Sequence, residues 1–96
     1  MVNTHSFRKS RLLGLPIGTA THRLRKTIMF MMAQKLGLDT CHCCRQKIET
    51  ANVFSIEHKE SWQLSDNPYE KFFDLRNIAF SHLKCNISSG SRNKIY

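Results

Sequence analysis

The sequence predicts a small α+β domain that contains helices, two short strands and a structural metal site. Three observations predict this fold class. The chain has 96 residues, enough for one domain with a modest core. Apolar residues recur at helical spacing in one segment and alternate with polar residues in a later one. Residues that commonly bind metals occur as two spaced pairs, Cys41-x-x-Cys44 and His82-x-x-Cys85. A metal is therefore expected to stabilise the small core.

The two ends of the chain are predicted to lie outside this domain. Residues 1–18 are expected to form a basic flexible arm, extended or disordered, because Gly14, Pro16 and Gly18 interrupt regular structure. Residues 91–96 are expected to form a basic tail.

The net charge of +8 is concentrated near the start of the chain. Residues 1–38 contain seven Lys or Arg and no Asp or Glu, whereas residues 39–96 contain eight basic and seven acidic residues. A basic arm on a nearly neutral domain is typical of a protein that binds a polyanion, and a solubilising tail is the alternative. The candidate phosphate contacts are Arg8, Lys9, Arg11, Arg23, Arg25 and Lys26.

The segment 19–38 is predicted to be a basic amphipathic helix. The helix is expected from residue 19 to residue 37, with Thr19 or Thr21 as N-cap and Gly37 at its end. Its expected buried face is apolar and consists of Leu24, Ile28, Met31, Met32 and Leu36. The cations in its first turns oppose the helix dipole, which leaves phosphate binding and a solvated face as competing explanations.

The cysteines favour a metal site over a disulfide framework, since three of the four lie within four residues. Zn²⁺ takes four thiolate or imidazole ligands in a tetrahedron, and a C-x-x-C turn supplies two. The predicted ligands of a structural zinc are Cys41, Cys44, His82 and Cys85. Cys43 in place of Cys44 is a less usual alternative, and His42 is expected to point outward.

The compartment is expected to be the cytoplasm. The apolar patch at 12–17 is too short and too interrupted for an export signal, and the run at 28–33 is too short to span a membrane. Reduced, metal-bound thiols are consistent with that compartment.

Residues 52–58 and 76–81 are predicted strands, the first because apolar and polar residues alternate along it. Ile78 and Phe80 are expected to face the core.

Two short helices are predicted in the second half of the chain. Pro68 is expected to begin one, with Asp66 or Asn67 as its cap. Residues 83–90 are expected to form the other, closed by Gly90.

The order of these motifs resembles that of the HNH endonucleases, specifically the small phage and bacterial HNH proteins. The matching segments are Cys41-His-Cys-Cys44, Ser55-Ile-Glu-His-Lys59 and Asn77-Ile-Ala-Phe-Ser-His-Leu-Lys-Cys-Asn86. The resemblance covers residues 39–90. It implies two antiparallel strands and a helix around a divalent metal, the ββα-metal or His-Me finger fold.

The resemblance also implies roles for single residues. His58 matches the general-base histidine, and Asn77 matches the asparagine that holds the loop bearing that base. Glu57 stands where Asp is common, and Asn86 stands where the last histidine usually lies. This makes an H-N-N variant, as in the HNH domain of RNA-guided CRISPR nucleases. His82 stands where the family usually has a cysteine of the second pair.

Elementary chemistry is consistent with these roles. A neutral imidazole takes a proton from water near neutral pH, and a hard cation such as Mg²⁺ or Mn²⁺ prefers oxygen ligands, which Glu57 and Asn86 supply. Glu57 and His58 alternate on the strand, so a bend or twist is needed for them to converge, and the strand end before Lys59 is the expected place for it. Simpler explanations stay open: His58 as an ordinary surface or core histidine, Glu57 as a surface carboxylate and Asn77 as a turn cap.

The leading hypothesis is therefore a metal-dependent DNA endonuclease or nickase in a bacterial or phage-infected cell, with structural zinc and catalytic Mg²⁺ or Mn²⁺. DNA is the expected partner, and phage packaging or recombination proteins are candidates for others. One alternative is a non-catalytic zinc-containing module that binds nucleic acid, and another is a zinc domain that binds proteins. The role of His82 as zinc ligand or as catalytic histidine is also open.

Overall fold

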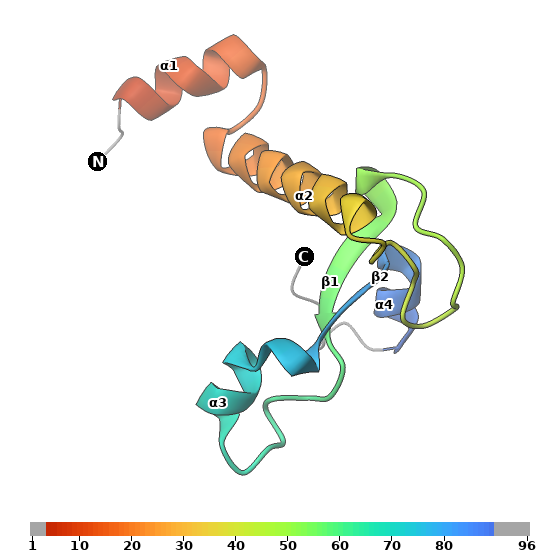
Figure 1. Cartoon of the computed structure of the whole chain (residues 1–96). Helices are drawn as coiled ribbons and strands as arrows, with labels where there is room; N and C mark the ends of the chain where they lie inside the picture. The colour runs from red at the N-terminus through yellow and green to blue at the C-terminus, as the bar shows by residue number, and fades with distance from the viewer. Residues whose placement is uncertain (1–3, 90–96) are drawn as a thin grey trace.

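The computed structural model describes residues 4–89 and shows a small α+β protein (Figure 1). The elements in chain order are α1 (Thr4–Leu13), α2 (Ile17–Lys35), β1 (Phe54–His58), α3 (Pro68–Phe73), β2 (Ile78–His82) and α4 (Leu83–Ser89). Single 3₁₀ turns precede each strand, at Ala51–Val53 and Leu75–Asn77. The sheet and α4 lie between α1 at one end of the molecule and α3 at the other.

The sheet consists of β1 and β2, which run antiparallel. The register pairs Phe54 with His82 and His58 with Ile78, and α4 packs on both strands. Both predicted strands are present with shifted bounds. Residues 52 and 53 belong to the first 3₁₀ turn, residues 76 and 77 belong to the second, and β2 extends to His82. All five residues of β1 are buried, because one face of the strand meets the core and the other meets buried polar side chains.

The hydrophobic core is small and lies between α2 and the sheet. Phe54 of β1 is fully buried and contacts two other rings, with centroids 5.3 Å from Phe30 of α2 and 5.1 Å from Phe80 of β2. Ile48 and Cys41 join this cluster from the segment that connects α2 to the sheet. A core of this size leaves much of the stability to other interactions.

The predicted buried face of α2 is wrong. Leu24, Ile28, Met31, Met32 and Leu36 are between 43% and 71% exposed. The helix instead packs through Phe30 and Ala33, with Met29 partly buried beside them. Both sets satisfy the three-to-four-residue spacing, so periodicity alone does not select the face. Phe30, the aromatic residue in the run of methionines, packs against Phe54 and so determines which face of α2 is buried.

The ends of α2 are partly as predicted. The helix begins at Ile17 after Pro16, so neither Thr19 nor Thr21 is its cap. Gly37 does end the helix: its φ of +72° and the hydrogen bond from the Leu38 amide to the Ala33 carbonyl, 2.7 Å, form a Schellman turn.

The interpretation of residues 1–18 as an extended or disordered arm is wrong for α1, which is helical from residue 4. The glycine and proline form the turn between two helices. Gly14 has φ +75° and donates to the Ser10 carbonyl at 2.9 Å. The Ser10 hydroxyl then accepts from the Ile17 amide at 2.8 Å and so caps α2.

The short helices follow the sequence closely. Pro68 is the first residue of α3, and the side chain of Asn67, rather than Asp66, accepts from the Glu70 amide at 3.3 Å. Gly90 and the predicted tail 91–96 lie outside the described residues. Within residues 4–89, no helix is long and apolar enough to cross a membrane.

The packing of α2 generates a stability prediction. Phe30→Ala should lower the free energy of unfolding by about 3 kcal/mol, because it removes a ring from a core with few others. Met32→Ala on the same helix should change it by less than about 0.5 kcal/mol, because Met32 is largely exposed. Urea unfolding of the zinc-loaded proteins measures both. Equal losses in the two variants would contradict the observed orientation of α2.

Candidate metal centre and buried polar site

The turn at residues 40–47 presents Cys41 and Cys44. Thr40 and Lys47 pair as a short antiparallel bridge, and inside it the Cys41 amide donates to the Gln46 carbonyl at 2.8 Å. Arg45 closes the turn in the left-handed conformation, with φ +66°. Its backbone amide donates to the Cys41 carbonyl at 3.0 Å. This geometry makes the metal knuckle expected of C-x-x-C, and we use that name for residues 40–47.

Four candidate ligands converge as predicted. The ligand atoms of Cys41, Cys44, His82 and Cys85 all lie within 4.8 Å of one another. Ligand atoms around tetrahedral zinc lie roughly 3.5 Å apart, given bonds of about 2.0–2.3 Å. The Cys44 Sγ to His82 Nδ1 distance is 3.3 Å. The donors therefore fit zinc, and a Cys₃His set could hold it with four ligands.

His82 is oriented for ligation through Nδ1. Its Nε2–H points at the Lys47 carbonyl oxygen, 3.0 Å away, and at Glu49 Oε1, 3.3 Å away. A backbone carbonyl is an acceptor only, so Nε2 carries a proton and Nδ1 faces the thiols. Burial opposes protonation, but the thiols of Cys41 and Cys44 raise the pKa of His82 to about 9. Zinc uptake must therefore displace a proton from Nδ1.

Cys41 is prepared for metal binding by its surroundings. Burial would raise its pKa, but backbone N–H groups oppose that effect: those of Cys44 and His82 lie 3.4 Å and 3.3 Å from Sγ. The result is a pKa of about 6 for Cys41, so the thiolate is present at neutral pH. The thiolate is the form that binds zinc.

Cys43 does not take the place of Cys44 in the cluster. Its Sγ instead lies 3.4 Å from Glu57 Oε1. Burial, and to a smaller extent the Glu57 carboxylate, raises the pKa of Cys43, so the thiol is protonated and donates to the carboxylate. His42 is half-buried, and its amide links the knuckle to the Phe80 carbonyl at 2.9 Å.

Glu57 and Asn86 belong to one buried polar network between the sheet and α4. Glu57 is 3% exposed and its Oε1 accepts from the Ser81 hydroxyl at 2.6 Å. Asn86 is fully buried, and its Nδ2 donates to Ser55 Oγ at 3.2 Å. Ser55 Oγ in turn donates to the Ser81 carbonyl at 3.0 Å. The explanation of Glu57 as a surface carboxylate is therefore wrong.

His58 is 2% exposed and lies against aromatic rings. Its Nε2–H donates to the Phe72 carbonyl at 2.9 Å, and its ring centroid is 4.9 Å from Phe72 and 6.5 Å from Trp62. Because Nε2 carries the proton, the neutral imidazole has its lone pair on Nδ1. The ring thus has one defined basic nitrogen.

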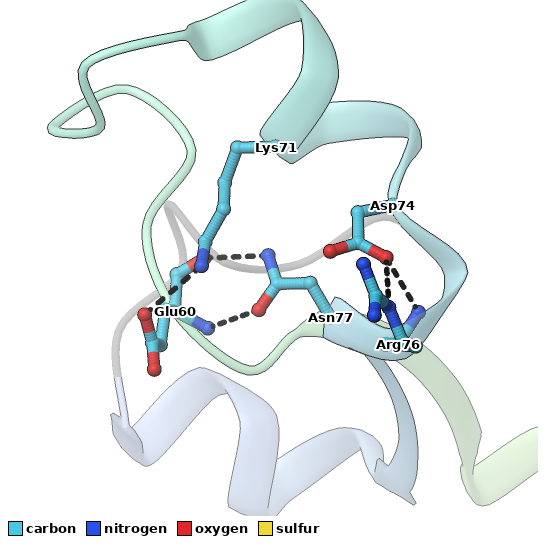
Figure 2. A network of polar contacts seen from close by, with 5 residues as sticks. All are labelled: Glu60, Lys71, Asp74, Arg76 and Asn77. Atoms are coloured by element: carbon cyan, nitrogen blue, oxygen red, sulfur yellow. Dashed lines mark hydrogen bonds and ion pairs between the residues drawn. The ribbon is translucent and has the colours of Figure 1, made fainter.

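Asn77 makes hydrogen bonds to both backbone polar groups of Glu60, which lies in the loop after His58. Its Oδ1 accepts from the Glu60 amide at 2.9 Å, and its Nδ2 donates to the Glu60 carbonyl at 3.0 Å (Figure 2). Nearby, Lys71 of α3 pairs with the Glu60 carboxylate at 3.0 Å. The expected hydrogen bonds from Asn77 to the loop backbone are thus present.

The structure does not bring Glu57 and His58 together in the expected way. β1 continues through His58, which pairs with Ile78, and the chain turns only after it, at residues 59 and 60. Glu57 contacts Ser81 and Cys43, whereas His58 contacts Phe72. Alternation along the strand separates them, as the pleat requires.

The candidate phosphate contacts lie on α1 and α2. Arg8, Lys9 and Arg11 are exposed on α1. On α2, Arg23 and Lys26 line a groove of about 210 Å³ between the helix and the 51–53 turn, whereas Arg25 is exposed but not part of its lining. His22 and Asn52 also line this groove. The sequence alone does not distinguish Arg25 from Arg23 and Lys26, which line the groove.

Three polar groups of the site were not predicted from the sequence: the hydroxyls of Ser55 and Ser81 and the thiol of Cys43. A signal for Ser55 is present, because Ser55 and Glu57 are two residues apart on a strand and so share a face. The bond from His58 to the Phe72 carbonyl had no such signal, because it depends on the loop conformation.

Comparison with protein-family models, with curated proteins and with solved structures finds no match for this chain.

The metal centre generates a prediction with adjacent residues as test and control. Cys44→Ser should lose most of the bound zinc and lower the melting temperature, because it removes a ligand from a cluster that stabilises a small core. Cys43→Ser makes the same chemical change one residue away and should keep one zinc per chain. Atomic emission and thermal melts measure both.

His82→Ala should behave like Cys44→Ser. A stable His82→Ala protein with full zinc content would remove His82 from the ligand set and reopen its assignment as a catalytic histidine.

Proposed function

We propose that the protein is a metal-dependent DNA endonuclease or nickase of the HNH type. The observation that supports this most directly is the pair His58 and Asn77. The histidine is the last residue of the first of two antiparallel strands. The asparagine directly before the second strand makes two hydrogen bonds to the loop that follows the histidine. The third element, α4, contributes Asn86 to the polar network on the sheet. This arrangement of two strands and a helix supports the proposed ββα-metal finger.

In this proposal His58 is the general base. The Phe72 carbonyl fixes the imidazole with its lone pair on Nδ1, and Nδ1 takes a proton from the attacking water. Asn77 is a positioning residue, because it holds the loop at Glu60, two residues after the base. Since His58 is 2% exposed, bound DNA must displace part of the cover formed by Trp62 and Phe72 before water reaches Nδ1.

The proposed catalytic cation is Mg²⁺ or Mn²⁺, held by Glu57 and Asn86. Both residues offer the oxygen donors that hard cations prefer. Ser81 and Cys43 contact Oε1 of Glu57, so Oε2 is the proposed ligand atom, and a hydrogen-bonded partner oxygen is usual for carboxylate ligands. When bound, such a cation stabilises negative charge on a phosphate and on a leaving oxygen. The Cys₃His zinc has a structural role in this proposal.

A second candidate is a zinc-containing module that binds nucleic acid without cleaving it. The burial of both Glu57 and His58 favours it, because a residue that neither water nor phosphate reaches does no chemistry. The basic residues of α1 and α2 serve either function. Cleavage activity separates the two candidates.

The test of the enzyme uses supercoiled plasmid with Mg²⁺ or Mn²⁺. The wild type should nick or linearise the plasmid, and His58→Gln should reduce the rate at least a hundredfold, because general-base catalysis contributes about that much. Gln retains an N–H donor for the Phe72 carbonyl but has no basic nitrogen. The melting temperature and zinc content of His58→Gln should therefore remain close to those of the wild type.

The matched control for this substitution is His42→Gln, on the knuckle and outside the proposed site. It should cleave at the rate of the wild type. Cleavage by His58→Gln at an undiminished rate would remove His58 as the base, and a wild type that binds DNA without cleaving it would favour the second candidate.

DNA binding is tested by its salt dependence. Arg23→Gln with Lys26→Gln should reduce the slope of log K against log salt by about 2, since each lost phosphate contact removes about 0.9. Arg25→Gln with Lys35→Gln removes the same charge from the same helix outside the groove and should change the slope much less. Fluorescence anisotropy on a short duplex measures both, and equal slopes would exclude the groove as the phosphate site.

A further inference from the structure

Cys43 occupies an unusual place, because it lies between two zinc ligands but contacts a different site. Cys41 and Cys44 belong to the Cys₃His cluster. The Sγ atom of Cys43 lies 3.4 Å from Glu57 Oε1 and 3.6 Å from Ser81 Oγ. The knuckle therefore presents two thiols to the metal and a third to a buried carboxylate.

Ser81 also contacts Glu57 and also lies next to a metal ligand in the sequence. Its hydroxyl donates to Glu57 Oε1 at 2.6 Å, and the next residue is the ligand His82. Each of the two donors to Glu57 is thus adjacent in sequence to a zinc ligand. Cys43 precedes Cys44, and Ser81 precedes His82.

The positions of both donors follow from this adjacency. A tetrahedral zinc fixes the ligand atoms of Cys44 and His82, and the short chain between each ligand and its neighbour restricts where the neighbour can lie. Glu57 is 3% exposed, so its carboxylate depends on hydrogen bonds from protein groups in place of water.

We propose that Cys43 and Ser81 are positioning residues that couple the zinc centre to the Glu57 carboxylate, holding Oε1 so that Oε2 is directed at a divalent cation. The cation part rests on the proposed function, whereas the coupling itself depends only on the contacts above. Zinc, in addition to stabilising the fold, then sets the orientation of the carboxylate. Loss of the thiol donor should weaken cation binding without loss of zinc.

The hydrogen bond is tested by infrared spectroscopy of the zinc-loaded protein. The chain has four cysteines, and three are ligands and carry no S–H, so the S–H stretching band reports Cys43 alone. The band should lie at the lower frequency of a hydrogen-bonded thiol and should move to higher frequency in Glu57→Gln, because an amide oxygen is a weaker acceptor than a carboxylate. A band at the frequency of a free thiol, unchanged in Glu57→Gln, would overturn the coupling.

The consequence for the cation is tested with Mn²⁺, whose free concentration is measured by electron paramagnetic resonance. Cys43→Ala should weaken Mn²⁺ binding by about tenfold or more, which is the effect of losing one hydrogen bond to a charged group. Cys43→Ser retains a donor and should restore most of the affinity. Both variants should keep one zinc per chain and a melting temperature near that of the wild type, which separates positioning from a structural role.

Equal Mn²⁺ affinity in Cys43→Ala and wild type, or no Mn²⁺ binding by the wild type, would overturn the positioning role. These measurements do not use cleavage. A protein that fails to cut plasmid while showing the predicted infrared band and Mn²⁺ affinities would thus contradict the proposed function and support the coupling.

Discussion

The convergence of Cys41, Cys44, His82 and Cys85 is the constraint on which the rest of the structure depends. The first two ligands lie on a turn that follows α2, and the other two lie at the junction of β2 and α4. A metal bound at this point would join segments about 40 residues apart and so limit the conformational freedom of everything between them. The apolar core, centred on Phe54, is too small to do this alone.

The sheet is short, yet it buries several polar side chains. Ser55, Glu57 and Ser81 face away from the apolar core, and their polar atoms must find partners inside the protein. The knuckle and α4 supply these partners, and the same two segments carry three of the four candidate metal ligands. A bound metal would therefore hold the partners of the buried polar groups against the sheet.

The sequence predicts best what is encoded over a few residues. The ligand spacing, the Asn67 cap and the Gly37 turn are local and appear as expected. The buried face of α2 depends on which side chains fit Phe54, and the helical spacing of Leu24 and Ile28 does not contain that information. The same applies to the contact of His58 with the Phe72 carbonyl, because the two residues are 14 positions apart in the chain.

The double hydrogen bond of Asn77 to Glu60 has a consequence for how the chain can vary. These two hydrogen bonds join the chain just before β2 to the chain just after β1. Residues 61–76 therefore form a loop whose two ends are held together whatever the length of the loop. Insertions and deletions between residues 61 and 67 would leave the sheet and the metal centre undisturbed. The stretch from Phe72 to Asn77 cannot change in length in the same way, since the Phe72 carbonyl must still accept the hydrogen bond from His58. Homologous chains should therefore differ most in length just after Glu60 and keep a constant spacing before β2.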